Sequence, residues 1–253
     1  MSIEKTSAIV LSITPFRETS SIAVLLTRSL GRASAIAKGI RRSPQAALVL
    51  ERGLLVELML YVKPNRDLHT VGQISVAKYY PSVRADLGKL ALRDAAFELI
   101  LKSVTAPETH TELFDFACGF LDRLEAADAA TLPVHELWRF FVGWAQHLGF
   151  MLNLRECVLC GSTAIAKEGG ALAIERGGLL CGTCARASAA TFMPGSVISF
   201  LLSGTPPEID RHADTLPEAT RLRLTRLLAD YCRFHLEIRT ELKSIGFLES
   251  VFF

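Results

Sequence analysis

Residues 20–38 have the sequence Ser20-Ser-Ile-Ala-Val-Leu-Leu-Thr-Arg-Ser-Leu-Gly-Arg-Ala-Ser-Ala-Ile-Ala-Lys38. Aliphatic and β-branched residues dominate its first part, which predicts a strand over 20–28. Ser29-Leu30-Gly31 predicts a turn, because glycine accepts a positive φ at no steric cost. Residues 32–38 alternate weakly and predict a further strand. This stretch therefore indicates two consecutive strands joined by a short turn.

The sequence on either side extends the pattern to five strands. Residues 5–14 predict a strand that ends at Pro15, and residues 54–62 and 68–76 predict two more, separated by the turn cluster at 64–67. A long irregular connection lies between the third and fourth strands. Five short strands in this order suit a small closed barrel such as the OB-fold. A small sandwich or an SH3-like barrel fits the pattern nearly as well.

After Pro81 the hydrophobic period changes to that of helices. The segment 134–149 is apolar nearly all round, which is typical of the buried centre of a helical bundle. Four other segments also predict helices: 90–104, 113–124, 197–202 and 224–238. We therefore expect an α+β multidomain protein, with a barrel domain over 1–80 and an all-α domain over 81–253. A separate insertion over 155–188 interrupts the helical domain.

Composition supports a folded protein that neither crosses a membrane nor is secreted. Half of the 253 residues are hydrophobic, which is enough for a sizeable core and excludes general disorder. The mean hydropathy is +0.30, yet no window reaches the roughly 18 uninterrupted apolar residues that a spanning helix needs. The first residues do not have the pattern of a secretion signal.

Four of the six cysteines form two C-x-x-C pairs, Cys157/Cys160 and Cys181/Cys184, with twenty residues between the pairs. This spacing is typical of a zinc ribbon, in which two tight turns aim four thiolates at one tetrahedral metal. Gly161 suits the positive φ that such a turn needs, and the glycine pairs at 169–170 and 177–178 suggest a small hairpin between the turns. The expected role is structural, because four sulfurs leave no open position for water.

Other interpretations of the cysteines stay open. The four thiols can also be a redox dithiol, two disulfides or unligated, and an iron–sulfur cluster is a minor alternative to zinc. One structural zinc ion is the leading interpretation. Cys118 and Cys232 lie on apolar helical faces and are expected to pack in the core.

Positive charge is concentrated near the N-terminus. Residues 1–80 carry a net charge of +6, and no acidic residue occurs from Thr27 to Leu50. Such a surface fits a polyanion such as a nucleic acid backbone, although an ordinary solvated face explains it about as well. Stacking aromatics are scarce in this region, so we expect phosphate contacts without base reading. The candidate DNA-binding residues are Arg28, Arg32, Lys38, Arg41, Arg42, Lys63 and Arg66.

No pattern in the sequence indicates catalysis. Walker A, G-x-G-x-x-G, H-E-x-x-H and G-x-S-x-G motifs are all absent. The six histidines form no close pair in the sequence. The expectation is therefore that the protein is not an enzyme.

The ordered set of motifs resembles the RecO family of bacterial recombination mediators. The resemblance rests on Ala8-Ile-Val-Leu11, Leu30-Gly-Arg32, Ala37-Lys-Gly-Ile-Arg-Arg42 and the segment from Phe140 to Leu154 that runs into Cys157. It also includes Glu18-Thr-Ser-Ser21, Leu54-Leu-Val-Glu-Leu58 and Leu68-His-Thr70. Ile40 stands where the family has alanine. The resemblance covers essentially the whole chain.

Membership of this family implies an N-terminal OB-fold, a helical C-terminal domain and a zinc-binding insertion. It implies a cytoplasmic, nucleoid-associated mediator of DNA repair that binds single- and double-stranded DNA and promotes strand annealing. It also implies recombinase loading with RecR in the RecF pathway, and binding of the acidic C-terminal tail of single-strand-binding protein. A protein-binding scaffold without DNA contact is the alternative. Five arginines along the last predicted helix are candidates to flank a pocket for that tail: Arg221, Arg223, Arg226, Arg233 and Arg239.

Overall fold

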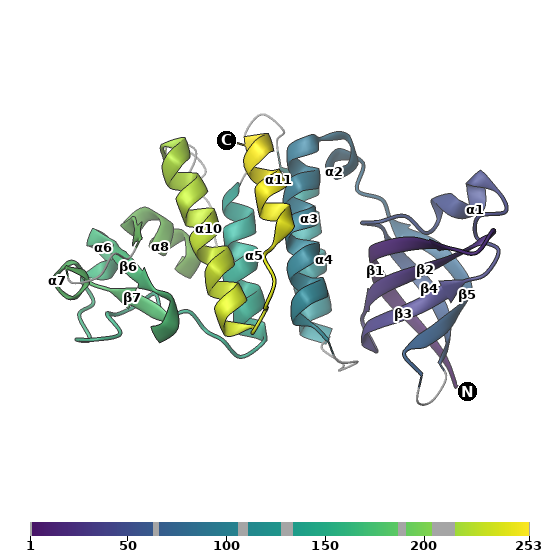
Figure 1. Ribbon diagram of the computed structural model, residues 1–253, viewed down its shortest axis with the longest axis horizontal. Coiled ribbons are helices and arrows are strands. Elements are labelled where there is room, and N and C mark those ends of the chain that lie inside the picture. The colour runs from purple at the N-terminus through teal and green to yellow at the C-terminus, as the bar shows by residue number, and fades with distance from the viewer. Residues whose placement is uncertain are drawn as a thin grey trace. The chain divides into compact units, whose positions relative to one another are not determined.

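The computed structural model of the chain describes residues 2–62, 66–105, 111–127, 134–186, 191–203 and 216–252 (Figure 1). Its contacts divide the chain into two compact units. We call them the barrel unit, Met1–Ala85 with Val104–Ala126, and the helical unit, Asp86–Ser103 with Ala127–Phe253. Each unit draws on two separate segments of the sequence.

The described residues of the barrel unit form five strands and three helices. The strands are β1 (Ser2–Phe16), β2 (Ser20–Thr27), β3 (Gly31–Ala37), β4 (Leu55–Val62) and β5 (Leu68–Lys78). The helices are α1 (Pro44–Leu48), α2 (Pro81–Ala85) and α4 (Thr111–Ala126). All five strands expected from the sequence are present, and their ends differ from expectation by at most a few residues.

The strands close into a barrel in the order β1-β2-β3-β5-β4 (Figure 1). Neighbouring strands are antiparallel except β3 and β5, which pair in parallel over Ser34–Ile36 and Leu68–Thr70. A register shift between Val10 and Ser12 bends β1, so that this long strand pairs with β4 in its first half and with β2 in its second. This is the OB-fold, and it excludes the sandwich and the SH3-like barrel as interpretations.

Small and branched side chains fill the barrel. Alternate residues of β3 point inward, so Ala33, Ala35 and Ala37 are buried. The buried core consists of Ala8, Val10, Ala23, Leu25, Ala35, Ala37, Leu50, Leu54, Val56, Leu58 and Leu60. Ile40 packs against this core from the loop after β3. The loop is therefore anchored to the barrel by an apolar contact.

Charged side chains join α4 to α2, and α2 to the segment before β4. Glu125 of α4 accepts hydrogen bonds from the backbone N–H groups of Ser82 and Val83 at the start of α2, at 3.1 Å each. Such a carboxylate satisfies N–H groups that the helix itself leaves unpaired. Arg84 of α2 forms an ion pair with Glu51, at 2.7 Å.

The helical unit contains a bundle of long helices. They are α3 (Leu87–Ser103), α5 (Val134–His147), α10 (Glu218–His235) and α11 (Lys243–Phe252), with the shorter α8 (Gly195–Ser203) beside them. Helix α5 packs against both α3 and α10 (Figure 1). Trp138 and Trp144 of α5 are fully buried, and each indole N–H donates a 2.8 Å hydrogen bond, to Thr225 and Ser103 respectively. The expectation that α5 is the buried centre is confirmed.

A small subdomain that carries the paired cysteines, which we call the ribbon, follows α5. It contains a three-stranded sheet in the order β7-β6-β8, formed by β7 (Gly178–Leu180), β6 (Gly170–Ala173) and β8 (Phe192–Met193). Two single-turn helices, α6 (Ile165–Glu168) and α7 (Gly182–Ala185), and the 3-10 turn η2 (Ile174–Arg176) complete it. The hairpin predicted between the glycine pairs is therefore present.

Two features at the C-terminal end differ from expectation. Helix α10 ends at His235, whereas the apolar pattern predicted helix as far as Ile238. Helix α11 follows it and had no counterpart among the predicted elements.

Within the described part of the chain, no helix combines the length and apolar character needed to cross a membrane.

Candidate nucleic-acid interface and metal centre

The four paired cysteines converge on one point of the ribbon. The Sγ atoms of Cys157, Cys160, Cys181 and Cys184 all lie within 4.8 Å of one another. The Cys160 and Cys181 sulfurs are 3.7 Å apart, and a tetrahedral site with Zn–S bonds of about 2.3 Å places its sulfurs about 3.8 Å apart. All six cysteines of the chain lie within the described residues, and all six are free thiols. The cluster can hold a metal ion.

Two different turns position these thiols. In the first, the Gly161 N–H donates to the Cys157 carbonyl at 2.8 Å, and Gly161 has a φ of 73°, as its place after the second cysteine predicted. In the second, Cys181 is the residue before α7, and Cys184 lies within this helix. The Val158 N–H donates to the Leu179 carbonyl at 2.9 Å, which ties the first turn to β7.

Backbone N–H groups point at the Cys157 sulfur. Burial alone raises the pKa of this thiol, but hydrogen bonds from the backbone of Cys181, Cys160 and Leu159 outweigh it and lower the pKa to about 6. Hydrogen bonds with Cys160 and then Cys181 raise the pKa of the Cys184 thiol to about 12. A hydrogen bond from the backbone of Cys184 also lowers the pKa of the Cys181 thiol. Cys157 and Cys181 thus favour the thiolate, which is the form that ligates a metal.

The other two cysteines lie outside this cluster. Cys232 in α10 is fully buried, and burial raises its pKa above the ordinary range. Cys118 in α4 is half-buried, and burial followed by the nearby charges of Asp122 and Asp115 raises its pKa to about 12. Core packing is confirmed for Cys232 and only in part for Cys118.

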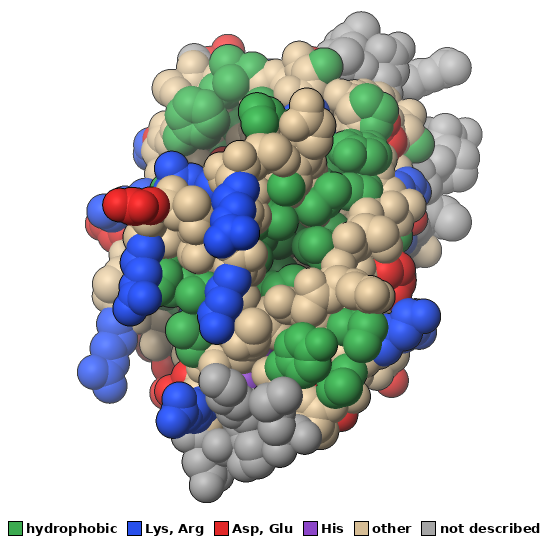
Figure 2. All heavy atoms as spheres, turned by 90° about the vertical axis from the view of Figure 1, so that its right-hand side faces the viewer, with side chains coloured by type: hydrophobic (Ala, Val, Ile, Leu, Met, Phe, Trp, Pro, Cys, Tyr) green, Lys and Arg blue, Asp and Glu red, His purple; other side chains and the backbone are tan. Residues whose placement is uncertain are grey.

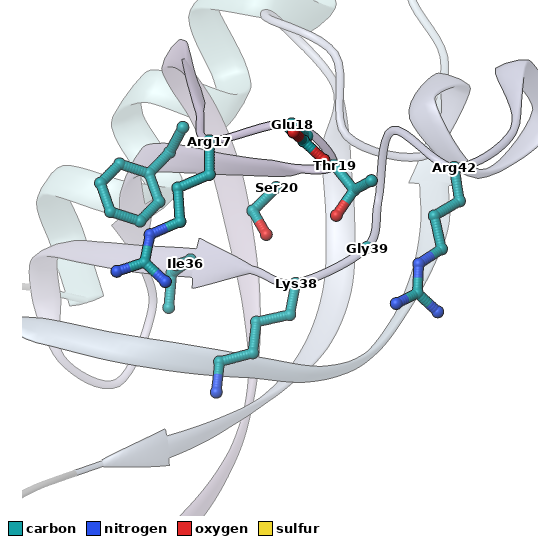
Figure 3. A pocket seen from close by; sticks show the side chains of 9 residues that line it. Arg17, Glu18, Thr19, Ser20, Ile36, Lys38, Gly39 and Arg42 are labelled. Carbon is teal, nitrogen blue, oxygen red and sulfur yellow. The ribbon is translucent and has the colours of Figure 1, made fainter.

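A second candidate site lies at one end of the barrel, where the β1–β2 turn meets the segment after β3. It is an open hollow of about 890 Å³. The residues that line it are Phe16, Arg17, Glu18, Thr19, Ser20, Ile36, Lys38, Gly39 and Arg42. Arg17, Lys38 and Arg42 are exposed, and their side chains extend in roughly the same direction (Figure 3). We call this hollow the basic pocket.

Figure 2 shows Lys and Arg side chains gathered along one side of a face of the barrel, with few acidic side chains among them. One carboxylate, that of Glu18, lines the basic pocket itself. Three cations against one anion leave the pocket positively charged. Such a surface attracts polyanions and gains affinity from the counterions that a phosphate backbone releases.

Hydrogen bonds join the two loops that form the basic pocket. The Arg41 N–H donates to the Thr19 carbonyl at 2.9 Å, so the segment after β3 is held against the β1–β2 turn. The Arg42 N–H donates to the Gly39 carbonyl at 3.0 Å. Gly39 has a φ of 69°, and a Cβ at this residue would lie 3.3 Å from the Arg42 Nε. The positive φ therefore favours glycine at this turn, and the glycine leaves room for the Arg42 side chain beside it.

The candidate DNA-binding residues do not all lie in one place. Lys38 and Arg42 line the basic pocket, and Arg41 belongs to the same loop. Arg28 and Arg32 lie at the other end of the β2–β3 hairpin. Arg66, in the connection between β4 and β5, is exposed, and Lys63 lies outside the described residues.

Arg28 and Arg32 are both engaged by the second segment of the barrel unit. The Arg28 Nη2 lies 3.1 Å from a carboxylate oxygen of Asp115 in α4, with about half of each side chain exposed. The Arg32 Nη1 donates to the Val104 carbonyl at 2.8 Å. The Asp115 carboxylate thus compensates part of the positive charge at this end of the hairpin, and the Val104 carbonyl engages Arg32. The cations of the basic pocket, in contrast, are exposed.

Arg17 is a functional candidate that the sequence did not single out. It is exposed, lines the basic pocket and follows the aromatic residue Phe16. Its position between Pro15 and Glu18 lies outside the stretch without acidic residues, so charge pattern alone does not indicate it. The signal that could have found it is structural, because an OB-fold binds its ligands beside the β1–β2 loop.

The arginines proposed along the last long helix lie in α10, except Arg239, which follows it. Arg223 and Arg226 line a concavity of about 340 Å³ together with Leu222 and Leu227. Arg226 also forms a two-point ion pair with Glu249 of α11. The acidic residue Asp230 lines it as well. The concavity therefore combines apolar and cationic side chains, which binding of an acidic peptide with an apolar end requires, with one carboxylate.

Comparison with known proteins finds family matches in both the N-terminal and the C-terminal part of the chain. The family described as "Recombination protein O N terminal" matches residues 1–80, and "Recombination protein O C terminal" matches residues 84–244. A protein of Prosthecochloris aestuarii named "DNA repair protein RecO" is 30% identical over 245 residues, which cover 92% of each chain. Proteins with the same name from Anaeromyxobacter dehalogenans and Caldanaerobacter subterraneus are 30% and 27% identical, over 72% and 92% of this chain and 70% and 93% of their own.

Proposed function

The chain belongs to the RecO family of DNA repair proteins, and from this premise we propose that it is a mediator of homologous recombination without enzymatic activity. In this proposal it binds single- and double-stranded DNA, promotes strand annealing and acts with RecR in recombinase loading in the RecF pathway. It works in the bacterial cytoplasm at the nucleoid. The domain over 1–80 binds DNA, and the domain over 81–253 carries the metal ribbon of 155–188.

The observation that carries the proposal is the basic pocket. Arg17, Lys38 and Arg42 are exposed around one hollow, and the neighbouring Arg41 anchors the loop that presents two of them. Contacts with phosphates give affinity without sequence preference, which suits a protein that must act at any damaged site. Arg28, Arg32, Lys63 and Arg66 remain further candidates for the path of the DNA.

Annealing needs no bond to be made or broken by the protein. Two complementary strands repel each other through their phosphates, and cations on the protein reduce that repulsion while the bases pair. The barrel unit supplies such cations in the basic pocket. The chemistry of annealing is then the base pairing itself.

The test is the salt dependence of DNA binding. Each phosphate neutralised on a single strand adds about −0.7 to the slope of log affinity against log salt. The double variant Lys38→Ala/Arg42→Ala should weaken binding to single strands and duplexes of random sequence and flatten the single-strand slope by about 1.4. Annealing should slow in parallel.

A matched control removes the same charge elsewhere. Arg176 and Arg239 are exposed residues of the helical unit, so Arg176→Ala/Arg239→Ala should leave the slope within about 0.3 of the parent value. If the pocket variant binds DNA with unchanged affinity and slope, DNA binding at this pocket is refuted. If the parent chain binds no DNA at all, the protein-binding scaffold becomes the better interpretation.

The metal that we propose for the four-cysteine cluster is one structural zinc ion. The spacing of the sulfurs and the four-thiolate ligand set both suit zinc, whose role would be to hold the two turns together. Elemental analysis of the purified chain should find one zinc per chain. A content well below one, or iron in its place, contradicts the assignment.

The concavity of α10 is our candidate for the partner tail. An acidic peptide with an apolar last residue can place that residue against Leu222 and Leu227 and its carboxylates near Arg223 and Arg226. Arg223→Glu should therefore weaken binding of the acidic C-terminal tail of single-strand-binding protein, and Arg239→Glu should affect it less. Equal effects of the two variants would place the tail elsewhere.

A further inference from the structure

The basic pocket contains a flat hydrophobic group beside its cations. Phe16, the last residue of β1, is half-buried and lines the pocket. The guanidinium carbon of Arg17 lies 5.3 Å from the centroid of the Phe16 ring, which is within the range of a cation–π contact. Binding of phosphates alone does not require an aromatic ring in this pocket.

The backbone of Arg17 is held in an unusual conformation. Its φ is 55°, and among the described residues only Arg17 and Glu237 have a positive φ without being glycine. An arginine in the left-handed region is disfavoured and persists only when its surroundings impose it. The loop after β3 imposes it here, because Arg41 bonds to the Thr19 carbonyl and its guanidinium also reaches the Arg17 carbonyl, at 3.5 Å. The turn thus keeps Arg17 next to Phe16.

The remaining lining groups complete a site for a nucleotide. The hydroxyl groups of Thr19 and Ser20 lie between the cationic side chains (Figure 3). The hollow of about 890 Å³ falls within the usual size of small-molecule sites, roughly 300–1,000 Å³. Flat apolar surface, hydroxyl groups and separate cations match the three parts of a nucleotide, namely base, sugar and phosphate.

We propose that the Phe16–Arg17 pair is a stacking platform for one unpaired base of single-stranded DNA, with the flanking phosphates at Lys38 and Arg42. This inference rests on the proposed function and names its ligand more narrowly. A base inside a duplex has both faces covered by its neighbours, so it cannot stack on the protein without leaving the helix. The platform therefore favours single strands over duplexes, and it tolerates any sequence because every base has a π-face.

The experiment replaces the ring without changing charge. Phe16→Leu keeps an apolar side chain and removes the aromatic face, and Phe16→Trp retains a face. The probes are an oligodeoxythymidylate with a single central 2-aminopurine and a random-sequence duplex, each titrated at several salt concentrations. Phe16→Leu should weaken single-strand binding about 5- to 100-fold. Duplex affinity should change less than about twofold, and the salt slope should stay the same.

Fluorescence reports stacking of the base directly, and the unchanged duplex affinity shows that the variant is folded. Binding to the parent chain should quench 2-aminopurine through stacking, and Phe16→Trp should preserve both the quenching and the single-strand affinity. Phe150→Leu, which removes an exposed ring of the helical unit, is the matched control and should change neither. Glu18→Gln should strengthen single-strand and duplex binding alike, since it removes only charge.

Two results would overturn the platform while leaving the proposed function intact. One is an equal loss of single-strand and duplex affinity in Phe16→Leu, with Phe16→Trp no better. The other is full DNA binding by the parent chain without any change in 2-aminopurine emission. If instead the parent chain binds no DNA at all, the proposed function itself fails. The platform is thus tested by the Phe16 variants, and the proposed function by DNA binding of the parent chain.

Discussion

At the scale of single residues, Gly178 shows how closely the ribbon is packed. A Cβ at this position would lie 2.3 Å from Val158 Cγ1 and 3.0 Å from the Asn153 carbonyl oxygen. Val158 directly follows the metal-ligand candidate Cys157, so displacement of Val158 would also move that thiol. Close packing and metal geometry therefore depend on the same glycine.

Replacing this glycine should loosen the ribbon. Gly178→Ala is expected to destabilise it by about 1–3 kcal/mol, the usual effect of overpacking, and to speed the transfer of zinc to a chelator. Gly182→Ala is the matched control, since nothing lies within 4 Å of a Cβ there. Zinc-release rates measured with a chromogenic chelator give the comparison. Equal rates for the two variants would mean that Gly178 is not needed for close packing.

Arg28 differs from Arg42 in having a carboxylate partner. Because Asp115 already compensates part of its charge, Arg28→Ala should reduce single-strand DNA affinity less than Arg42→Ala does. Asp115→Asn should increase affinity, as it frees the Arg28 guanidinium for a phosphate. Titrations of one fluorescent oligonucleotide against the three variants at fixed salt check this order. A larger loss for Arg28→Ala would place the DNA at the opposite end of the hairpin.

At the scale of elements, Glu98 of α3 joins the start of α11 to the bundle. Its carboxylate accepts hydrogen bonds from the N–H groups of Lys243 and Ser244, at 3.1 and 2.7 Å, and forms an ion pair with Lys102 at 2.9 Å. Burial raises the pKa of Glu98, but the hydrogen bonds from Lys102 and Ser244 outweigh it and hold the pKa below its ordinary value. The charged form is thus favoured in the folded state.

Stability should follow the charge of this carboxylate. Its folded-state pKa is depressed, so its contribution is complete above the unfolded value, near pH 4.3, and is lost as the pH falls through the folded value. Glu98→Gln should lower the free energy of unfolding by about 0.5–2 kcal/mol at pH 7, with a smaller difference near pH 3. Urea unfolding at the two pH values, with the exposed Glu241→Gln as control, measures it. A difference that does not depend on pH would contradict the capping role.

The local sequence pattern predicted most helices and strands, but not those that depend on residues far away in the sequence. The five strands were recognisable because β-branched residues and turn clusters delimit them, and α5 because nearly all its faces are apolar. Helix α11 was missed: it is short, and the residue that caps it, Glu98, lies far away in the sequence. The same holds for the sites. The C-x-x-C pairs and Lys38 are local signals, whereas the role of Arg17 depends on the turn that Arg41 holds.

At the scale of the whole molecule, the proposed metal site and the proposed DNA contacts lie in different units. All four cysteines of the cluster belong to the helical unit, and the basic pocket belongs to the barrel unit. Structural zinc contributes on the order of 10–16 kcal/mol of apparent binding energy in isolated finger peptides. Loss of the metal should therefore unfold the ribbon without removing the pocket.

Removal of the metal should affect the folding of the ribbon but not the binding of DNA. Cys160→Ser, or treatment with a strong chelator, is expected to abolish zinc binding and to expose the amides of β6 and β7 to hydrogen exchange. Oligonucleotide affinity should stay within about twofold of the parent value, because the residues that line the basic pocket all belong to the barrel unit. Hydrogen-exchange mass spectrometry and DNA titrations on the same samples check both statements. A parallel loss of DNA affinity would mean that the ribbon itself takes part in binding.

The interleaved order of the two units has a consequence for synthesis on the ribosome. The barrel strands emerge first, but Asp115 and Asp122, which pair with Arg28 and Lys78, lie in α4 and emerge later. At about 5–20 residues per second, the interval between Ala85 and Ala126 lasts roughly 2–8 s. For that time the nascent barrel is more basic than the finished protein, and its partner helix is still being translated.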